Sequence, residues 1–258
     1  MKKSTAIILL AAAGLLIAAG VALGVTQGWG SGESQDYQYV TDADTALDIR
    51  AELSAADVFV YDAYDDVLRV ELYDAPRVTV SGEKGAVTLR EKSGGVHWRL
   101  FGREESRVVL WVPVGLRGSI RVETASGDID VNSLKGAELT LSLSTASGDV
   151  GIYDAEASAA EIHTVSGNIW MGTNDLPGVS AVSTSGDISV YGFPCDKLEL
   201  STVSGDVWCS LPGAAEDYSV SVSTVSGEVY GVHHSHGSGG KEVSVSTVSG
   251  DVSLQYEN

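Results

Sequence analysis

One phrase, close to Thr-x-Ser-Gly-Asp-Val-x-Val, recurs seven times in the second half of the chain. The first copy reads TASGDIDV and the fifth reads TVSGDVWC. The copies begin at Thr124, Thr145, Thr164, Ser183, Thr202, Thr224 and Thr247, and their glycines stand 19 to 23 residues apart. Self-similarity at such a period is typical of proteins in which short units stack on one another. The chain is therefore expected to fold as an array of coils.

Within each copy, apolar and polar residues alternate with the period of two that marks a β-strand. In the fifth copy, Leu198, Leu200 and Thr202 are expected to point inward before the bend, and Val207 and Cys209 after it. A unit this short cannot bury its own apolar edge, so it must stack on its neighbours. The sequence predicts an all-β fold, a single-stranded parallel β-solenoid (β-helix) with coils of 19–23 residues.

The bend of each copy combines a threonine or serine, a glycine and, in all but one copy, an acidic residue. We expect the hydroxyl to point inward and the glycine to adopt a positive φ. The acidic side chain is expected to accept hydrogen bonds from the amides of its own bend. A calcium ladder that includes Asp206 and Asp251 is the alternative, but the chain lacks the glycine-rich nonapeptide of calcium-loaded β-rolls. Calcium is therefore not expected as a cofactor, and a chelator should leave the melting temperature unchanged.

The N-terminal residues have the features of a membrane segment. An uncharged run of 20 residues from Ala6 to Val25 follows Lys2 and Lys3. A helix of that length spans about 30 Å, which matches the hydrocarbon core of a bilayer. We expect residues 1–25 to form a single-pass anchor in the cell membrane, with the body of the protein extracellular. A signal peptide that is cleaved before secretion is the alternative.

The remaining chain divides into three parts. Residues 26–36 are rich in Gly and Ser and are expected to form a flexible linker. Residues 37–118 are strand-like but irregular, and we expect them to form the first coils of the extracellular solenoid. Residues 119–258 hold the seven regular repeats. Because the pattern continues to the last core position, Leu254, the C-terminal coil is expected to leave an open strand edge through which copies can associate.

The net charge of −19 limits the partners of the chain. From Ser119 onward there are four Arg and Lys residues against nineteen Asp and Glu residues. Nucleic-acid binding needs dense positive charge to neutralise phosphates, so the repeat region is not expected to bind nucleic acid. Acidic polysaccharides need basic residues too, which weighs against an enzyme that cleaves them.

Three aromatic residues occupy the outward position between the two core residues of the second strand. They are Trp170, Trp208 and Tyr230. Exposed rings on a sheet can stack on the sugar rings of a glycan, which makes these residues the candidate ligand-binding site. Packing against other side chains on the sheet surface is the favoured interpretation, because only three of the seven copies carry an aromatic residue here.

The histidines and cysteines carry weaker signals. His233, His234 and His236 lie in the loop GVHHSHGSGG, where clustered imidazoles can bind zinc or copper weakly, but a surface loop is the favoured interpretation. Cys195 follows Pro194 in an expected turn, whereas Cys209 occupies a core position. Whether the two thiols pair stays open. No metal site and no catalytic thiol is expected.

Nucleophile triads, phosphate-binding loops and dinucleotide fingerprints do not occur in the sequence, so an enzyme is not expected. The residues from Tyr37 to Leu254 resemble a bacterial family of β-strand-repeat proteins of unknown function, grouped as "putative adhesins". The resemblance rests on VVLWVPVG (Val108 to Gly115), then IRVETASGDIDV (Ile120 to Val131), then the serial TxSGD copies. It implies an envelope-associated protein and carries no catalytic motif.

The favoured function is a non-enzymatic surface scaffold for adhesion or ligand binding, with glycans or envelope proteins as partners. An accessory protein that senses envelope stress through protein partners is the alternative. A polysaccharide-active enzyme is a remote third reading, because acidic residues suited to glycoside hydrolysis are widespread in the chain.

Overall fold

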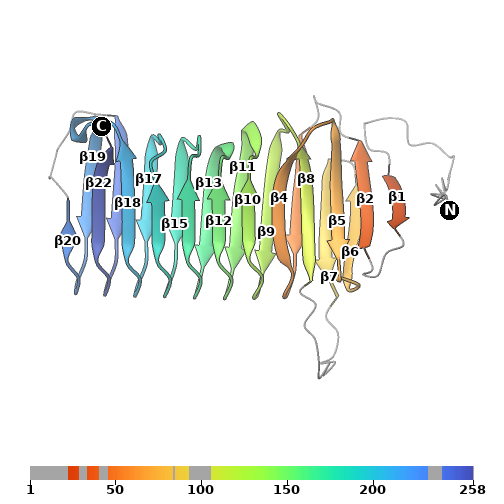
Figure 1. Ribbon diagram of the computed structural model, residues 1–258, viewed down its shortest axis with the longest axis horizontal. Coiled ribbons are helices and arrows are strands. Elements are labelled where there is room, and N and C mark those ends of the chain that lie inside the picture. Colours follow the sequence, from red (N-terminus) through yellow and green to blue (C-terminus); the bar gives the residue numbers. More distant parts are fainter. Residues whose placement is uncertain are drawn as a thin grey trace, which may run out of the picture.

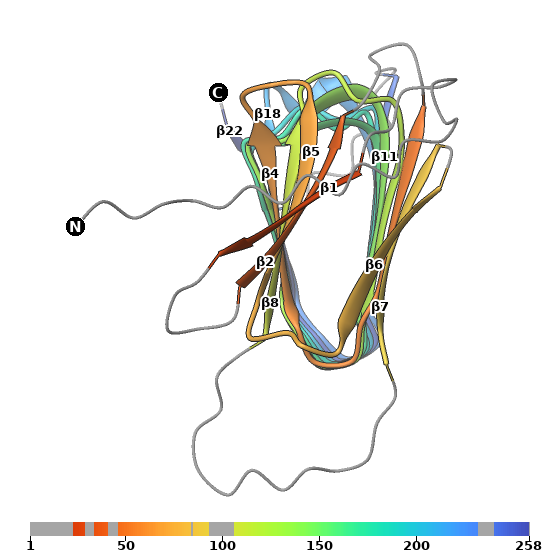
Figure 2. The ribbon, with the colours of Figure 1, turned by 90° about the vertical axis from the view of Figure 1, so that its right-hand side faces the viewer.

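The structure, a computed structural model, describes residues 23–28, 34–40, 46–83, 85–92, 106–231 and 240–257. These residues form two long sheets that face each other across one continuous apolar core. Figure 1 shows the strands stacked side by side along the long axis of the molecule, and Figure 2 shows the two sheets from one end. The only helical element among the described residues is a short 3₁₀ turn, η1 (Ala215–Asp217).

Sheet A is the sheet of twelve strands. In spatial order they are β1 (Leu23–Gly28), β2 (Ser34–Val40), β5 (Val67–Tyr73), β8 (Arg107–Pro113), β4 (Asp57–Ala63), β10 (Ile129–Asn132), β12 (Val150–Tyr153), β14 (Ile169–Gly172), β16 (Ile188–Tyr191), β18 (Val207–Pro212), β22 (Val252–Glu257) and β20 (Val229–Tyr230).

Sheet B is the sheet of ten strands. In spatial order they are β19 (Tyr218–Ser223), β21 (Lys241–Ser246), β17 (Lys197–Ser201), β15 (Gly178–Val182), β13 (Glu156–Thr164), β11 (Lys135–Thr145), β9 (Gly118–Thr124), β3 (Leu47–Glu52), β7 (Ala86–Glu91) and β6 (Val78–Glu83).

Each regular coil contributes one strand to each sheet. The first copy runs along β9, turns at its bend, continues along β10 and returns to sheet B at β11. Neighbouring coils pair in parallel and in register, so that Ile129, Val150 and Ile169 lie opposite one another in sheet A. The inward residues predicted for the fifth copy are all buried, including Leu200 and Cys209. The predicted β-solenoid and its inward–outward register are confirmed for the repeats.

The hydroxyl of each bend joins two coils. Thr164 Oγ1 donates a hydrogen bond to the carbonyl oxygen of Gly148 in the preceding coil (3.2 Å) and accepts one from the N–H of Gly167 (3.0 Å). The same pair of bonds recurs at Thr145, where the partners are Gly127 and Gly148. Because these hydroxyls are buried and saturated, they hold the bends of adjacent coils at a fixed spacing.

The bend glycines do not adopt the positive φ that was expected. Glycines with positive φ occur elsewhere, for example at Gly213 and Gly231, but none of the seven bend glycines is among them. The reason for glycine is the close approach of the next backbone. A Cβ added to Gly148 would lie 1.9 Å from the carbonyl oxygen of Gly127. The expected positive φ was therefore wrong. A side chain is excluded at these positions because the backbone of the neighbouring coil lies too close.

The last two coils are stacked in reverse order. Strand β22 lies between β18 and β20, and β21 lies between β17 and β19, so the seventh copy sits directly on the fifth. Strand β22 pairs with all six residues of β18, whereas β20 offers only two residues for pairing. The longer ladder therefore occupies the inner position. The expectation of an open edge at the C-terminal coil was wrong, because the sixth coil (β19 and β20) forms that end of the solenoid.

The opposite end of the solenoid is closed by antiparallel strands. Coil β3–β4 lies beside the first copy, and β7 and β8 pair in parallel with β3 and β4. Strand β6 is antiparallel to β7, β5 is antiparallel to β8, and β2 is antiparallel to β5. The parallel solenoid predicted from residue 37 thus gives way to reversed strands, which cover the edge that a parallel stack would leave open.

The N-terminal predictions fall largely outside the described residues. Residues 1–22, which hold most of the expected membrane anchor, are not among them, and neither are residues 29–33. Strands β1 and β2 occupy part of the expected linker and pair with each other in antiparallel fashion. Within the described ranges, no helix has the length and apolar character that crossing a bilayer requires.

Candidate functional site

The aromatic residues of the solenoid surface are gathered on the outer face of sheet A. Trp170, Trp208 and Tyr230 lie there, as their outward parity predicts, with the tryptophans half-buried and Tyr230 51% exposed. The register places them in one row across the sheet, with Ser189 between the tryptophans and Ser253 between Trp208 and Tyr230. The rings therefore recur at every second strand, about 10 Å apart.

The spacing of this row depends on the reversed order of the last two coils. In the order of the chain, Tyr230 would belong to the coil next to Trp208. Because β22 is inserted between β18 and β20, Ser253 takes that neighbouring position and Tyr230 lies one strand further out. The reversal thus continues the alternation of large and small side chains to the end of the sheet.

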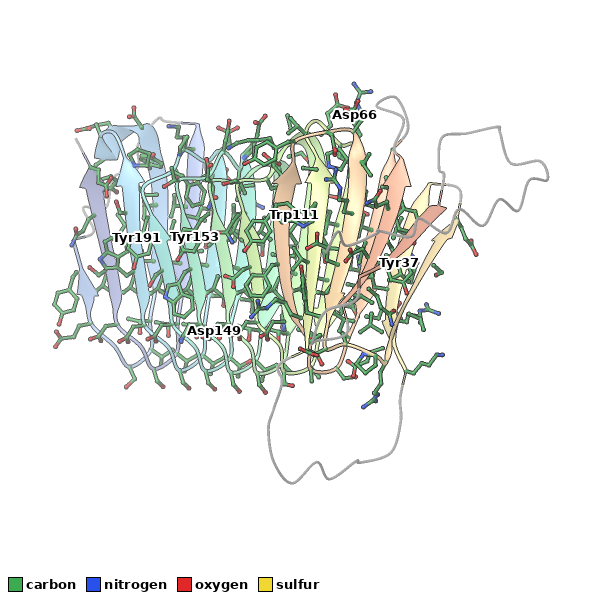
Figure 3. The ribbon with its side chains drawn as sticks, turned by 45° about the vertical axis from the view of Figure 1, so that its right-hand side comes forward. Tyr37, Asp66, Trp111, Asp149, Tyr153 and Tyr191 are labelled. Atoms are coloured by element: carbon green, nitrogen blue, oxygen red, sulfur yellow. The ribbon has the colours of Figure 1, made fainter. Side chains whose placement is uncertain are left out.

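A second aromatic row lies beside the first and was not identified from the sequence. Tyr153 and Tyr191 stand on either side of Gly172 and are 38% and 47% exposed. The ring of Tyr191 packs against that of Trp208, with centroids 4.7 Å apart. Figure 3 shows Tyr153 and Tyr191 on the same face as Trp111. Strand alternation could have identified them as outward-facing. In its own strand, each lies two residues after the outward position that Trp170 occupies in β14.

The outer face of sheet B is different in character. From β9 to β19 its outward positions carry mainly serine, threonine and charged residues, such as Ser142 and Glu161, and no Phe, Trp or Tyr among the described residues. The two faces are built by the same repeats. An even scatter of surface aromatics would populate both of them, so the concentration on sheet A marks that face as the candidate binding surface.

The N-terminal part of the same face is occupied by its own side chains. Trp111 packs against Tyr61 with ring centroids 5.1 Å apart, and Tyr61 stacks on Phe59 at 6.4 Å. The guanidinium of Arg107 lies over the Phe59 ring at 5.3 Å. Trp208 also has a ring partner in Tyr191, but the rings of the N-terminal part hold a cation as well. The part of the face from β10 to β20 is therefore the better candidate for an external ligand.

Asp130 is the acidic residue in the middle of this face. It lies between Phe59 of β4 and Gly151 of β12 in the sheet register. Burial raises the pKa of its carboxyl, and the nearby charges of Asp128, Asp57 and Asp149 raise it further. No hydrogen bond to this carboxylate is formed by the described residues.

The space beside Asp130 is shaped by two glycines. A Cβ on Gly151 would lie 2.6 Å from Asp130 Oδ1 and 3.3 Å from Cε2 of Tyr153. A Cβ on Gly172 would lie 3.4 Å from the other side of the same tyrosine ring. The ring of Tyr153 therefore lies low over the sheet between these glycines, next to the carboxylate. Burial, and then the proximity of Tyr191 and Asp130, raises the pKa of the Tyr153 phenol.

We expect the substitution Asp130→Asn to stabilise the protein at neutral pH. Because the folded-state pKa of Asp130 lies above the ordinary value of 3.8, the folded protein binds this proton more tightly than the unfolded chain does. The free energy of unfolding therefore falls as the pH rises through and above that value. The asparagine variant escapes this loss, so its melting temperature should exceed that of the wild type at neutral pH. The difference should vanish in acid, where Asp130 is protonated. Glu161→Gln is the control for the same change of charge at an exposed position, and equal gains in both variants would contradict the prediction.

The acidic residues of the bends form a ladder along one edge of the solenoid. Asp149 Oδ1 accepts a hydrogen bond from the N–H of Asn168 (2.7 Å), and Asp206 Oδ1 accepts one from the N–H of Asp251 (2.8 Å). The amide donor thus belongs to the next coil and not to the same bend, which corrects the expectation. Figure 3 shows Asp149 at this edge. Each carboxylate helps to set the register between two coils.

The other predicted candidates are not brought together into a site. Within the described ranges, no group of three His, Cys, Asp or Glu side chains is arranged to hold a metal, and this includes Asp206 and Asp251. His233, His234 and His236 lie outside the described residues.

Both cysteines are buried free thiols. Cys209 occupies the core as predicted. Cys195 lies in the connection between β16 and β17, as expected, but its side chain is buried there. Burial raises the pKa of Cys195 to about 11 and raises that of Cys209 as well. Both thiols are therefore protonated at neutral pH, which makes them poor nucleophiles.

Comparisons with known proteins give the following similarities. A search of curated proteins finds no match. Among solved structures, the chain is similar to a "putative adhesin" from Bacteroides fragilis NCTC 9343, with 14% identity, coverage of 87% of this chain and 97% of the other, and a TM-score of 0.47. A "putative cell adhesion protein" from Clostridium sporogenes ATCC 15579 gives 10% identity, coverage of 87% and 100%, and a TM-score of 0.41. A "putative lipid binding protein" from Parabacteroides distasonis ATCC 8503 gives 12% identity, coverage of 90% and 98%, and a TM-score of 0.42.

The family comparison covers nearly all of the solenoid. The model described as Toastrack DUF4097 matches residues 45–169 and 119–255. The two matches overlap within the first regular coils and together extend from β3 to β22, apart from the last residues of that strand. The chain belongs to the Toastrack DUF4097 family.

Proposed function

We propose that the protein is a non-enzymatic scaffold at the cell surface that binds a ligand on the outer face of sheet A. The observation that carries this proposal is the concentration of exposed aromatic rings on one of the two sheet faces. Rings held on a rigid sheet lose little conformational entropy on binding, so a flat row of them suits an extended ligand. The buried, protonated thiols and the structural use of the bend carboxylates favour binding over catalysis.

The proposed location rests on the N-terminal sequence. An apolar run long enough to span a bilayer, preceded by two lysines, supports a single-pass anchor with the solenoid outside. A stiff solenoid on such an anchor would hold its aromatic face away from the membrane, where surface glycans are accessible. We therefore propose glycans as the ligand class.

The test is binding of the full-length chain, held in detergent micelles, to insoluble cell-wall preparations and immobilised polysaccharides. The double variant Trp170→Ala/Trp208→Ala is expected to bind at least about tenfold more weakly, since a stacked aromatic ring contributes on the order of 1 kcal/mol or more. Tyr64→Ala is the matched control, because Tyr64 is a fully exposed aromatic residue in a turn away from the row.

Two outcomes would contradict the proposed function. One is wild-type binding by the double variant, provided that its melting temperature shows it to be folded. The other is the absence of binding to every glycan in the panel. If the purified chain turned over a polysaccharide, the protein would be an enzyme and not a scaffold.

A further inference from the structure

The binding part of the outer face of sheet A contains no basic residue of its own. Strands β10, β12, β14, β16, β18, β22 and β20, with the bends that precede them, contain no Lys or Arg. The bends carry carboxylates at every coil but one, where Asn168 takes the position. Lys135 and Lys197 belong to sheet B and pair with Asp154 and Glu199. The guanidinium of Arg107 lies over the ring of Phe59 on the neighbouring strand β4. An anionic polymer laid on this face would meet repulsion along its whole length.

Asp130 is the acidic residue on this face at which we expect a ligand's positive charge to bind. Its carboxylate is half-buried, receives no hydrogen bond from the described residues, and lies in the field of Asp128, Asp57 and Asp149. A buried charge without a partner is costly, and a hydroxyl donor from a ligand would leave the net charge in place. An ammonium group would both donate hydrogen bonds and neutralise the charge. The edge of the Tyr153 ring lies beside this carboxylate, above Gly151.

The aromatic rows give the ligand its shape. Trp170, Trp208 and Tyr230 recur at every second strand, about 10 Å apart, which is close to the length of one disaccharide unit. The register positions between them are serines, and the ring of Tyr191 packs against Trp208 from the strand between the tryptophans. Pyranose rings present flat C–H faces that suit such a surface, whereas a peptide of irregular side chains has no reason to match its period.

We propose that the outer face of sheet A from β10 to β20 binds a polysaccharide of amino sugars that carry free ammonium groups. One ammonium group sits between Asp130 and the Tyr153 ring, and the neighbouring sugar rings stack along the aromatic row. This inference rests on the proposed function and adds the charge of its ligand. Charge complementarity selects this polymer over neutral or acidic ones with the same backbone.

The test compares three oligosaccharides of equal length by calorimetric titration of the full-length chain in detergent micelles, at mildly acidic pH. They are a β-1,4-linked glucosamine oligomer with free amino groups, its N-acetylated form and a uronic acid oligomer. The free-amine oligomer is expected to bind at least about tenfold more tightly than the acetylated form, because hydrogen bonds to charged groups are stronger than those between neutral groups. The uronic acid oligomer should not bind. Added salt should weaken the first interaction more than the second.

The substitution Asp130→Asn should reduce the affinity for the free-amine oligomer to that of the acetylated form and leave the latter unchanged. Glu161→Gln removes one negative charge from the outer face of sheet B and should change neither affinity. Equal binding of the acetylated and free-amine oligomers, or no effect of Asp130→Asn, would overturn the inference while the proposed function stands. An oligolysine of equal charge that binds as tightly would overturn the assignment to sugars. Failure to bind any oligomer or cell-wall glycan would overturn both proposals.

Discussion

The substitution Gly167→Ala should abolish the folded solenoid or destabilise it by more than about 4 kcal/mol. A Cβ at this position would lie 1.7 Å from the carbonyl oxygen of Gly148 and 2.9 Å from Thr164 Oγ1. Both are fixed parts of the bend, so relief requires adjacent coils to separate and the buried Thr164 bonds to break. The measurement is the midpoint of denaturant unfolding, followed by circular dichroism.

Gly178→Ala provides the matched control for this substitution. Gly178 belongs to strand β15 of the same region, and the nearest atom to an added Cβ is Ala159 Cβ at 3.9 Å, an ordinary contact. Its substitution should change the free energy of unfolding by no more than about 0.5 kcal/mol. If both variants were equally stable, close packing of the bends could not be the reason for glycine in the repeated phrase.

The second large effect is expected at Val245 in strand β21. This side chain is 1% exposed and lies between Leu200 of β17 and Val222 of β19, so Val245→Asp would bury an unpaired carboxylate between two coils. The expected loss is on the order of 4 kcal/mol, visible as a lower melting temperature and denaturation midpoint. Because β21 lies inside the sheet, the protein cannot relieve the buried charge by opening an end coil alone.

Val222→Asp is the partner variant that tests the order of the coils. Val222 occupies the equivalent position in the sixth copy, is only partly buried, and lies on the outermost strand of sheet B. Its substitution should cost about 1 kcal/mol, because the end coil can open without the rest. If the coils were stacked in the order of the chain, Val245 would be the outer residue and the two effects would be exchanged.

The repeated phrase was sufficient to predict the coil, its inward register and the outward position of Trp170. Each of these follows from strand alternation, which depends only on local pattern. The outward position of Tyr153 follows from the same alternation. It was missed because Tyr153 lies beyond the last residue of the repeated phrase, at the second outward position of its strand. The role of Asp130 depends on its neighbours across the sheet.

The order of the last coils could not be predicted from the repeats. The sixth and seventh copies read TVSGEV and TVSGDV, so either fits beside the fifth. The choice depends on how far each strand continues after the bend, and β22 continues to Glu257, whose carboxylate accepts a hydrogen bond from Ser210. The role of the bend glycines could not be predicted either. A glycine required for a positive φ and a glycine required because a neighbouring backbone lies too close look the same in the sequence.

The reversed order of the last coils also sets a sequence of events during synthesis. From β9 to β18, each coil has its stacking partner already made when it leaves the ribosome. The sixth coil emerges before β21 and β22, the strands on which it stacks. It must therefore wait for them, and until they arrive the edges of β17 and β18 stay open. The solenoid can therefore be completed only after the seventh copy has been translated.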